Sequence, residues 1–301
     1  MNEADRAAWS DFWGQQRRGG DGGGCLPQGW GVIDKAQQRV WHEVARKLAR
    51  NARVLDLATG DARVLRWLRM KRTDLKLVGV DAAPDLPPPP QGCKVKAGIA
   101  METLPFGNAV FDLVTSQFGF EYGDMARSTR EIARVLKADG EAVLMVHRTD
   151  GPILQHNLRR QQALRWALEE QDIVGVARQA SASNAAGQLL ANRLGIIAAE
   201  GARQFGPQSP AWELPEAMRR SVLLALRHDP ASLLATIAML EERARNEMAR
   251  ITSLQRACAA ADAREVMLTT TEAAGLAAQT ITPVFTDDRH AFANLIVLKR
   301  S

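Results

Sequence analysis

The stretch RVLDLATGDARVL, residues 53–65, limits the possible folds of this chain more than any other part of it. Its residues 54–57, VLDL, predict a buried strand, the small residues after them predict a tight turn, and the next residues predict a helix. Because Ala58, Gly60 and Ala62 carry little or no side chain, a ligand can approach backbone N–H groups and the helix N-terminus there. This order indicates a nucleotide-type site in an open parallel sheet.

The turn does not have the pattern of a dinucleotide site. That fingerprint requires glycine at the first, third and sixth positions, where this chain has Ala58, Gly60 and Arg63. The chain instead has an acid followed by alternate small residues, Asp56, Ala58, Gly60 and Ala62. This pattern resembles motif I of the class I S-adenosylmethionine (SAM)-dependent methyltransferases, in the variant of the ubiquinone/menaquinone-biosynthesis type. Ala62 stands where the family has its third glycine.

Four further segments follow in the order that this resemblance requires. Residues 77–81, LVGVD, predict a second buried strand that ends in Asp81, 25 residues after Asp56, and a carboxylate there can accept hydrogen bonds from both ribose hydroxyls. Residues 98–106 resemble the family's adenine loop, with Ile99 in place of its usual acid. Residues 110–117 resemble motif IV, the strand whose end faces the methyl group, and residues 131–141 resemble the helix and turn before strand five.

The resemblance covers roughly residues 46–150 and implies an α/β fold, a Rossmann-like doubly wound sheet. It implies seven strands, mostly parallel with an antiparallel last strand, and SAM as the cofactor. No spacing of His, Asp or Glu argues for a metal. The cofactor-binding residues that the resemblance implies are Asp56, Ala58, Thr59, Gly60, Asp61, Asp81, Ala82, Ala100, Met101, Gln117 and Phe118.

The composition sets outer limits on the function. The three cysteines are far apart and form neither a metal motif nor a disulfide framework, and the polar N-terminus does not resemble a signal peptide, so we expect a cytoplasmic protein. No apolar run approaches the ~20 residues of a membrane span. The net charge of +5 is spread along the chain, and no basic run is interleaved with aromatic residues. A solvated surface is therefore favoured over a nucleic-acid groove.

The first 45 residues predict a helical cap followed by a glycine-rich hinge. Trp9, Phe12 and Trp13 fall mostly on one side of a helix, and residues 17–24 then read RRGGDGGG. Resembling proteins use such a segment to cover the cofactor pocket, although a plain linker is an equal alternative. Residues 86–90, LPPPP, leave no room for the helix that the family has between strands two and three.

After strand five, residues 141–147, about 110 residues interrupt the fold. We predict a first part of the SAM-binding core at 46–151, a helical insertion at 152–261, and a final part at 262–301 with a helix at 264–274 and strands at 278–285 and 292–298. The insertion predicts helices at 153 to about 178, 185–202, 215–227 and 231–260, and we expect it to shape the acceptor pocket. Its last helix has apolar residues at steps of three and four, so it should pack against the same insertion or form a homodimer.

Methyl transfer from a sulfonium mainly requires alignment and exclusion of water, which supply ~7–11 kcal/mol without an acid or base. A base is needed only for an acceptor that carries a proton. The candidates are His147 at the end of strand five, Tyr122 after strand four, and His156 at the start of the insertion. Each has a structural alternative: a backbone hydrogen bond, packing, and a surface helix, respectively.

The sequence thus predicts a SAM-dependent methyltransferase that acts on a small, largely apolar metabolite such as a quinone, phenol, polyketide or lipid-like compound. Two alternatives remain open at this point. The chain can be a SAM-fold protein with a non-methylating or scaffold role, which Ile99 and Ala62 favour weakly. It can also methylate RNA or protein, which a contiguous basic stripe across the insertion would support.

Overall fold

The computed structural model describes residues 3–19, 30–179, 184–227 and 232–300. The expected glycine-rich hinge lies largely outside these residues. The chain divides into two compact units, one formed by residues 1–154 together with 253–301 and the other by residues 155–252. We describe each unit by itself.

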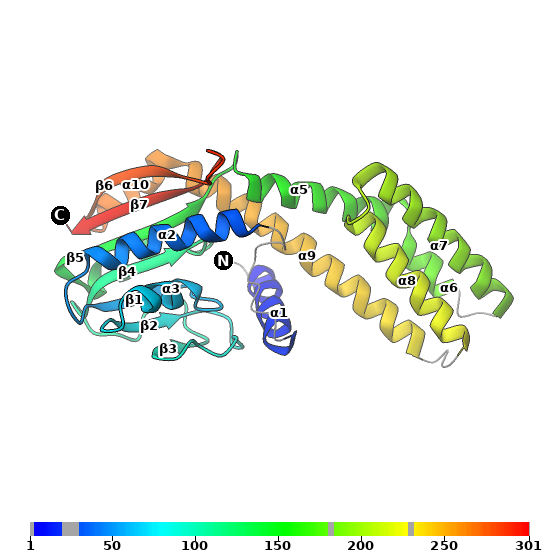
Figure 1. The fold of residues 1–301 in the computed structure, drawn as a ribbon, viewed down its shortest axis with the longest axis horizontal. Helices are drawn as coiled ribbons and strands as arrows, with labels where there is room; N and C mark the ends of the chain where they lie inside the picture. Colours follow the sequence, from blue (N-terminus) through cyan, green and yellow to red (C-terminus); the bar gives the residue numbers. More distant parts are fainter. Residues whose placement is uncertain (1–2, 20–29, 180–183, 228–231, 301) are drawn as a thin grey trace. The chain divides into compact units, whose positions relative to one another are not determined.

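The first unit is built on a seven-stranded sheet with the order β3-β2-β1-β4-β5-β7-β6 (Figure 1). Strands β1 to β5 run parallel to one another, and β7 is antiparallel to both of its neighbours. This confirms the predicted Rossmann-like fold. The strands are β1 Arg53–Leu57, β2 Lys76–Val80, β3 Cys93–Lys96, β4 Phe111–Gln117, β5 Leu136–His147, β6 Leu276–Phe285 and β7 Ala291–Arg300.

Helices cover both faces of this sheet. In the view of Figure 1, α2 and α3 lie in front of the strands, whereas α10 lies behind them. Leu55, Leu57 and Val114 of the sheet share one buried cluster with Ile132 of α4 and Met267 of α10. The helices of this unit are α1 Glu3–Gly19, α2 Gly31–Lys47, α3 Arg63–Lys71, the single 3₁₀ turn Phe120–Tyr122, α4 Met125–Val135 and α10 Arg264–Ala273.

The strand order reverses between β1 and β4, because β1 continues to β2 and β3 on one side while β4 and β5 lie on the other. Ligands of open α/β sheets bind outside the carboxyl ends of the strands at such a point. The turn after β1 lies there. As the proline-rich sequence predicted, the described residues between β2 and β3 contain no helix.

Strand β5 is longer than predicted. Residues 136–140 were expected to form a turn before a strand beginning at Glu141, but they belong to the strand. Leu136 pairs with Phe111 of β4, and the register of the β4–β5 pair shifts between Phe111 and Leu113. The two strands pair on both sides of this irregularity. A hydrogen bond from Arg300 Nη1 to the Leu136 carbonyl holds this early part of β5 against the end of β7.

The second unit is helical, but its first helix is not continuous as predicted. It consists of α5 Pro152–Arg165, a π-helical turn Trp166–Glu170, and α6 Ile173–Gln179. Asp172 has a φ of 44°, which ends the first segment, and its carboxylate accepts a hydrogen bond from the Gly175 N–H. Asp172 therefore caps a new helix, and a side-chain cap of this kind competes with helix continuation.

Helix α8 also differs, because it runs over Pro210–Arg227 and so starts five residues before the predicted position. Pro210 occupies a first-turn position, where its missing N–H is tolerated. Pro215 lies inside the helix and cannot bond the carbonyl of Ala211. That carbonyl lies against Gly201 of α7 Asn184–Phe205, where an added methyl group would overlap it. The proline thus occurs where two helices approach closely.

The apolar seam of α9 Leu233–Asp262 is filled from within the chain. Leu233, Ile237 and Ala244 belong to a buried cluster with residues of α5 to α8. Arg160 of α5 also donates to Glu247 of α9 at 2.6 Å. The intramolecular alternative is therefore confirmed for this part of α9, and that part of the seam is not available to a second copy.

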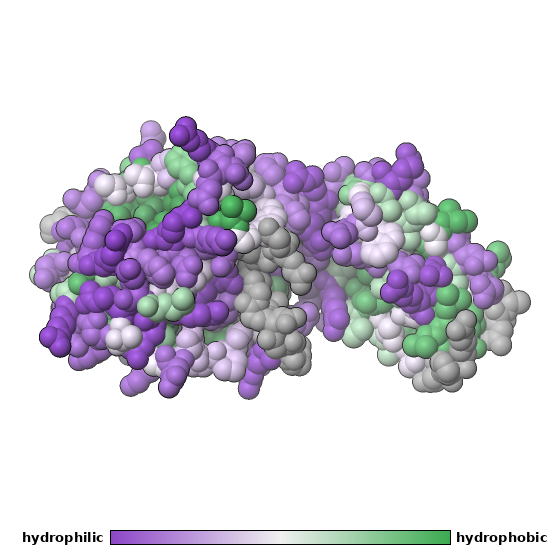
Figure 2. Space-filling model, viewed as in Figure 1, coloured by the Kyte–Doolittle hydropathy of each residue, from purple (hydrophilic) through white to green (hydrophobic). Residues whose placement is uncertain are grey.

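Figure 2 shows apolar patches among hydrophilic side chains on the helices of the second unit. Exposed apolar residues of α7 and α8 include Leu189, Ile196 and Leu224. Among the residues that the structure describes, no helix combines the length and the apolar character that crossing a membrane requires.

Candidate active site

The turn after β1 is held in an uncommon backbone conformation. Ala58, Gly60 and Ala62 have φ values of 51°, 51° and 57°, a left-handed region that costs a residue with a side chain roughly 1–2 kcal/mol. The Thr59 N–H donates to the Val80 carbonyl of β2 at 3.0 Å, which fixes the turn to the neighbouring strand. Strained residues of this kind concentrate at functional sites.

Asp56, near the end of β1, holds this turn by a hydrogen bond to Thr59. Its side chain is buried and accepts hydrogen bonds from Thr59 Oγ1 at 2.6 Å and from Thr115 Oγ1 at 2.7 Å. Thr115 lies opposite Asp56 in the β1–β4 ladder, so the pairing follows from the strand register. Burial raises the pKa of Asp56 to about 7, despite the opposing effect of the two hydroxyls, and the charges of Asp81 and Asp61 add to the increase.

Asp81, at the end of β2, lies beside the turn. Its Oδ2 accepts the N–H of Gly60 and its Oδ1 the N–H of Ala83, each at 2.9 Å. Burial raises the pKa of this carboxyl, and the backbone hydrogen bonds oppose the increase. A carboxylate has about four acceptor positions, so each oxygen can accept a further hydrogen bond. These free acceptor positions fit the two hydroxyl donors of a ribose diol.

Trp13 of α1 lies against the same turn, because a methyl group added to Gly60 would overlap its ring. Gly60 is thus required both by its positive φ and by the close approach of the indole. Arg17 of α1 pairs with Asp85 beyond β2 at 2.7 Å. The N-terminal helix therefore contacts the residues around Gly60 and the segment after Asp81.

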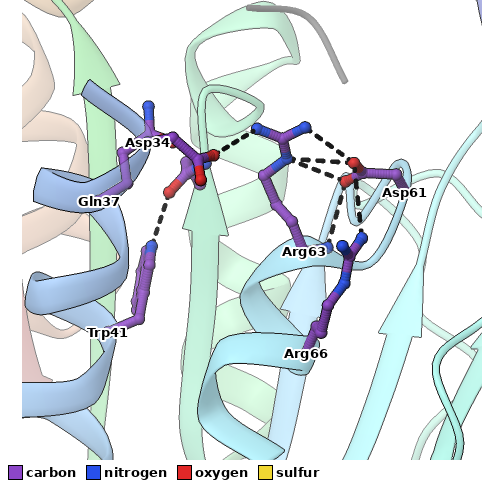
Figure 3. A network of polar contacts seen from close by, with 7 residues as sticks. Asp34, Gln37, Trp41, Asp61, Arg63 and Arg66 are labelled. Atoms are coloured by element: carbon purple, nitrogen blue, oxygen red, sulfur yellow. Dashed lines mark hydrogen bonds and ion pairs between the residues drawn. The ribbon is translucent and has the colours of Figure 1, made fainter. Parts of the chain in front are cut away.

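Asp61 is held by an ion-pair network rather than left free (Figure 3). Arg63 donates to its carboxylate at 2.9 Å and reaches Asp34 of α2 at 3.4 Å, while Arg66 lies 3.9 Å from Asp61. Asp61 is only 6% exposed, so the arginines supply the counter-charge that its burial requires. The network ties the turn to α2 and α3.

Gln117, at the end of β4, is directed to α2. Its Oε1 accepts the indole N–H of Trp41 at 2.6 Å and its Nε2 donates to Gln37 at 3.3 Å. Trp41 is fully buried, as expected of a core residue. Both groups of the Gln117 amide therefore already have partners in the protein.

The segment expected to surround the adenine lies next to Asp81. The Ile99 N–H donates to the carbonyl of Asp81 at 2.8 Å, and the carbonyl of Ala100 accepts the Thr103 N–H at 3.1 Å. Ala82, Ala100 and Met101 are half-buried. Of the expected cofactor residues, the structure brings together the turn after β1, Asp81 and the residues directly joined to them.

A second group lies where β4 and β5 end. Phe118, with a φ of 55°, places its ring 4.1 Å from the ring of His147, and the ring of Tyr122 lies 5.9 Å from His147. Tyr122 also contacts Trp9 of α1 at 5.6 Å. Through Phe12, Trp9 connects to Trp13 with centroid distances of 5.7 and 5.0 Å. We call these six residues, Trp13, Phe12, Trp9, Tyr122, His147 and Phe118, the aromatic row.

Glu121 was not singled out by the sequence as a functional residue. Its Oε1 accepts both the backbone N–H of His147 at 2.9 Å and a hydrogen bond with His147 Nδ1 at 2.8 Å. The available signal was an acid directly after strand four combined with a histidine at the end of strand five. Adjacent parallel strands bring their carboxyl ends together.

His156 belongs to the second unit and is described with it. It is partly buried on α5, and its pKa is lowered by burial and by the positive charges of Arg160 and Arg159. A separate hollow of about 250 Å³ lies in the first unit between the strand ends and α10, lined by Arg148, Asp262, Arg264 and several apolar residues. None of the expected cofactor residues lines this hollow.

The fold and the turn define the class of protein. Residues 55–144 match the Methyltransf_11 family, described as a methyltransferase domain. This match covers most of β1, Asp81, β4 and most of β5, on a seven-stranded sheet that is mostly parallel and has an antiparallel last strand, as predicted. The chain therefore contains a class I SAM-dependent methyltransferase domain, and SAM is the cofactor of that class.

Two curated proteins, both named as methyltransferases, have sequences similar to this chain. The ubiquinone/menaquinone biosynthesis C-methyltransferase UbiE of Geotalea uraniireducens is 33% identical over 121 residues, 36% of this chain and 52% of that protein. The demethylmenaquinone methyltransferase of Thermotoga maritima is 36% identical over 98 residues, 31% of this chain and 42% of that protein. The chain thus spans about half the length of the curated relatives it matches.

Among solved structures, the 1,6-didemethyltoxoflavin-N1-methyltransferase of Burkholderia thailandensis aligns with 98% of this chain and 88% of its own. The sequence identity is 12% and the TM-score is 0.46. The class assignment rests on the sequence matches, and the family match, residues 55–144, ends before the helical second unit.

Proposed function

We propose that this protein transfers a methyl group from SAM to a small, largely apolar acceptor. The observation that carries the proposal is the turn of Ala58, Gly60 and Ala62, whose central N–H is bound by Asp81 and whose glycine lies against Trp13. SAM supplies an electrophilic methyl group on a sulfonium. The residues of this chain bind it, orient the acceptor and exclude water.

Within this proposal, Asp81 accepts hydrogen bonds from the ribose hydroxyls, and the turn faces the amino-acid end of SAM. Ala82, Ala100 and Met101 border the adenine. Asp56 and Asp61 act through the turn that they brace, because their oxygens are held by Thr59, Thr115 and Arg63. Gln117 supports the site through α2.

The aromatic row supports an acceptor with a flat, apolar body. It extends by ring contacts from Gly60 to His147, so the surface beside the methyl donor is rich in aromatic side chains. Such surfaces bind apolar and aromatic groups. One relative is named for ubiquinone/menaquinone biosynthesis and the other as a demethylmenaquinone methyltransferase, which favours a quinol or phenol as the first acceptor to examine.

In the proposal His147 receives the acceptor's proton, while Phe118 and Tyr122 lie beside the acceptor. His156 is a further candidate for the base. Replacing His147 by Gln and His156 by Gln separates the two candidates: the first substitution is expected to lower turnover, and the second to leave it unchanged.

The test has two stages on the full chain. Calorimetric titration with SAM and with S-adenosylhomocysteine should show binding that weakens at least tenfold in Asp81→Ala and stays unchanged in Asp288→Ala, an exposed control. Labelled SAM is then offered with quinols, phenols, RNA and protein. Binding of neither cofactor form would leave the scaffold alternative, and label in RNA or protein alone would overturn the small-molecule proposal.

A further inference from the structure

Glu121 and His147 form a buried pair in which one carboxylate oxygen holds two groups of the same histidine. Glu121 Oε1 lies 2.9 Å from the backbone nitrogen of His147 and 2.8 Å from its Nδ1. The Glu121 side chain is 0% exposed and that of His147 is 7% exposed. The glutamate therefore fixes both the position of the His147 backbone and the orientation of the ring.

This contact also determines which ring nitrogen carries the proton of a neutral imidazole. An ionised carboxylate only accepts hydrogen bonds, so Nδ1 must be the donor. Nε2 is then left with its lone pair. The hydrogen bond made by one ring nitrogen sets the tautomer of the other, and here it leaves Nε2 as the basic nitrogen.

The charge of Glu121 has no other counter-ion among the described residues. Its Oε2 is buried without a hydrogen-bond partner in that part of the chain. The nearby thiol of Cys258 stays neutral, because burial, the charge of Glu121 and that of Asp262 raise the pKa of Cys258 to about 12. A buried carboxylate is costly unless it is paired, so a positive charge that develops on the His147 ring is stabilised by Glu121.

We propose that Glu121 is a positioning residue that orients His147 as a general base. The acceptor therefore carries an acidic proton, either on the atom that is methylated or on a group conjugated to the carbon that is methylated. Hydroxyl groups of phenols, quinols and enols belong to this class. The inference rests on the proposed methyl transfer. It adds Glu121 to the site and requires an acceptor with an acidic proton, which methyl transfer by positioning alone does not require.

The step balances as follows. His147 Nε2 takes the proton of the acceptor hydroxyl, and the electron pair freed on the acceptor, at oxygen or at the conjugated carbon, forms the new bond to the methyl carbon. The carbon–sulfur bond breaks and its electron pair stays on sulfur, which leaves a neutral thioether. His147 holds the proton as an imidazolium paired with Glu121 and then releases it to water. After attack through carbon, the methylated carbon of the acceptor gives its proton to water, which restores the aromatic ring as a phenolate.

A readout that is independent of turnover is nitrogen NMR of the full chain with labelled histidine, recorded at the alkaline end of its stable range. The chain has five histidines, and the signals of His147 are assigned by their loss in His147→Gln. If that variant does not fold, the four other histidines are replaced in turn. Wild type is expected to hold the neutral proton on Nδ1.

Glu121→Gln should mix the two tautomers and move the Nδ1 proton signal, because the amide lacks the negative charge. Glu141→Gln is the matched control, since Glu141 lies on the same strand as His147, β5, and pairs with Lys299 at the surface. A wild-type proton on Nε2, or identical His147 signals in wild type and Glu121→Gln, would overturn the inference.

The catalytic readout uses 4-nitrophenol, phenol and hydroquinone as acceptors. In Glu121→Gln, kcat should fall by about 10²-fold or more with SAM affinity unchanged, and Glu121→Asp should recover part of the loss. The loss should shrink as the acceptor becomes more acidic, whereas a purely structural role predicts the same loss for all. Turnover only of acceptors without an exchangeable proton would overturn the inference.

The two proposals fail in different ways. If wild type binds neither SAM nor its demethylated product, the proposed function is wrong and the catalytic role of the pair is lost with it. If SAM binds and the methyl group is transferred, but His147 has the other tautomer, only the role of Glu121 is wrong.

Discussion

The indole of Trp13 lies directly against Gly60, 47 positions later in the sequence, so that no side chain fits between them. This contact joins α1 to the turn that carries the proposed methyl-donor site. Gly60 is therefore required both by its positive φ and by the close contact with the Trp13 ring, and the energetic effects of these two constraints can be measured separately.

Gly60→Ala should destabilise the protein and weaken SAM binding, because it adds both backbone strain and overlap with Trp13. Trp13→Ala removes the overlap but not the strain. The double variant should therefore lose less free energy of unfolding than the sum of the two single variants, with a coupling of about 0.5–3 kcal/mol. Chemical denaturation of the four proteins measures this coupling, and strict additivity would show that the contact has no energetic role.

Gly79→Ala should damage the site from the other side. Gly79 lies on β2, and a methyl group there would lie 2.6 Å from Thr59 Oγ1, the hydroxyl that bonds Asp56. We expect a loss of about 1–3 kcal/mol together with weaker SAM binding. Gly31→Ala is the control, because nothing lies within 4 Å of the added methyl group. Equal effects of the two substitutions on SAM affinity would contradict this account.

Asp56 predicts an unusual dependence of stability on pH. The folded protein keeps its proton until about pH 7, whereas an unfolded Asp releases it near pH 4. Between these values the folded state binds more protons, so the Asp56 contribution to the free energy of unfolding falls as the pH rises, by up to about 4 kcal/mol.

Asp56→Asn should remove this contribution, because the amide resembles the protonated carboxyl and does not titrate. Relative to wild type, the variant should gain stability on going from pH 5 to pH 8, as measured by urea denaturation. Asp288→Asn, on an exposed turn, should leave the wild-type pH dependence intact. A wild-type dependence in Asp56→Asn would mean that another group is responsible.

Arg63→Met should leave Asp61 buried without its main counter-charge. Arg63 is 14% exposed on its side chain and donates to Asp61 at 2.9 Å, whereas Arg66 is 45% exposed and lies 3.9 Å away. We expect Arg63→Met to cost about 3 kcal/mol and Arg66→Met less than about 1 kcal/mol. Thermal unfolding at two salt concentrations measures both, and similar losses would contradict the assigned order.

The local parts of the site were predictable from sequence because each is coded within a few residues. The small residues after β1 indicated a tight turn, which the structure has, and Asp81 follows directly from an apolar strand that ends in an acid. The missing helix between β2 and β3 follows in the same way from four consecutive prolines. In each case the covalent chain itself restricts the backbone.

The contacts between distant residues were not predictable in this way. The Glu121–His147 pair depends on the alignment of β4 with β5, and that register includes an irregularity that the sequence does not signal. The contact of Trp13 with Gly60 depends on how α1 docks on the first unit. The break at Asp172 was missed because apolar periodicity continues through residues 166–177, and an aspartate within it looked like an exposed helical position.

Strand β7 lies between β5 and β6, although the helical insertion separates β7 from β5 in the sequence. Lys299 of β7 pairs with Glu141 of β5. During synthesis, the edge of β5 is exposed while more than a hundred further residues emerge from the ribosome, and exposed edges promote aggregation. The insertion has its own buried cluster and can fold during this interval. Closure of the sheet must wait for β7, so removing residues 291–300 should abolish soluble expression rather than merely weaken the protein.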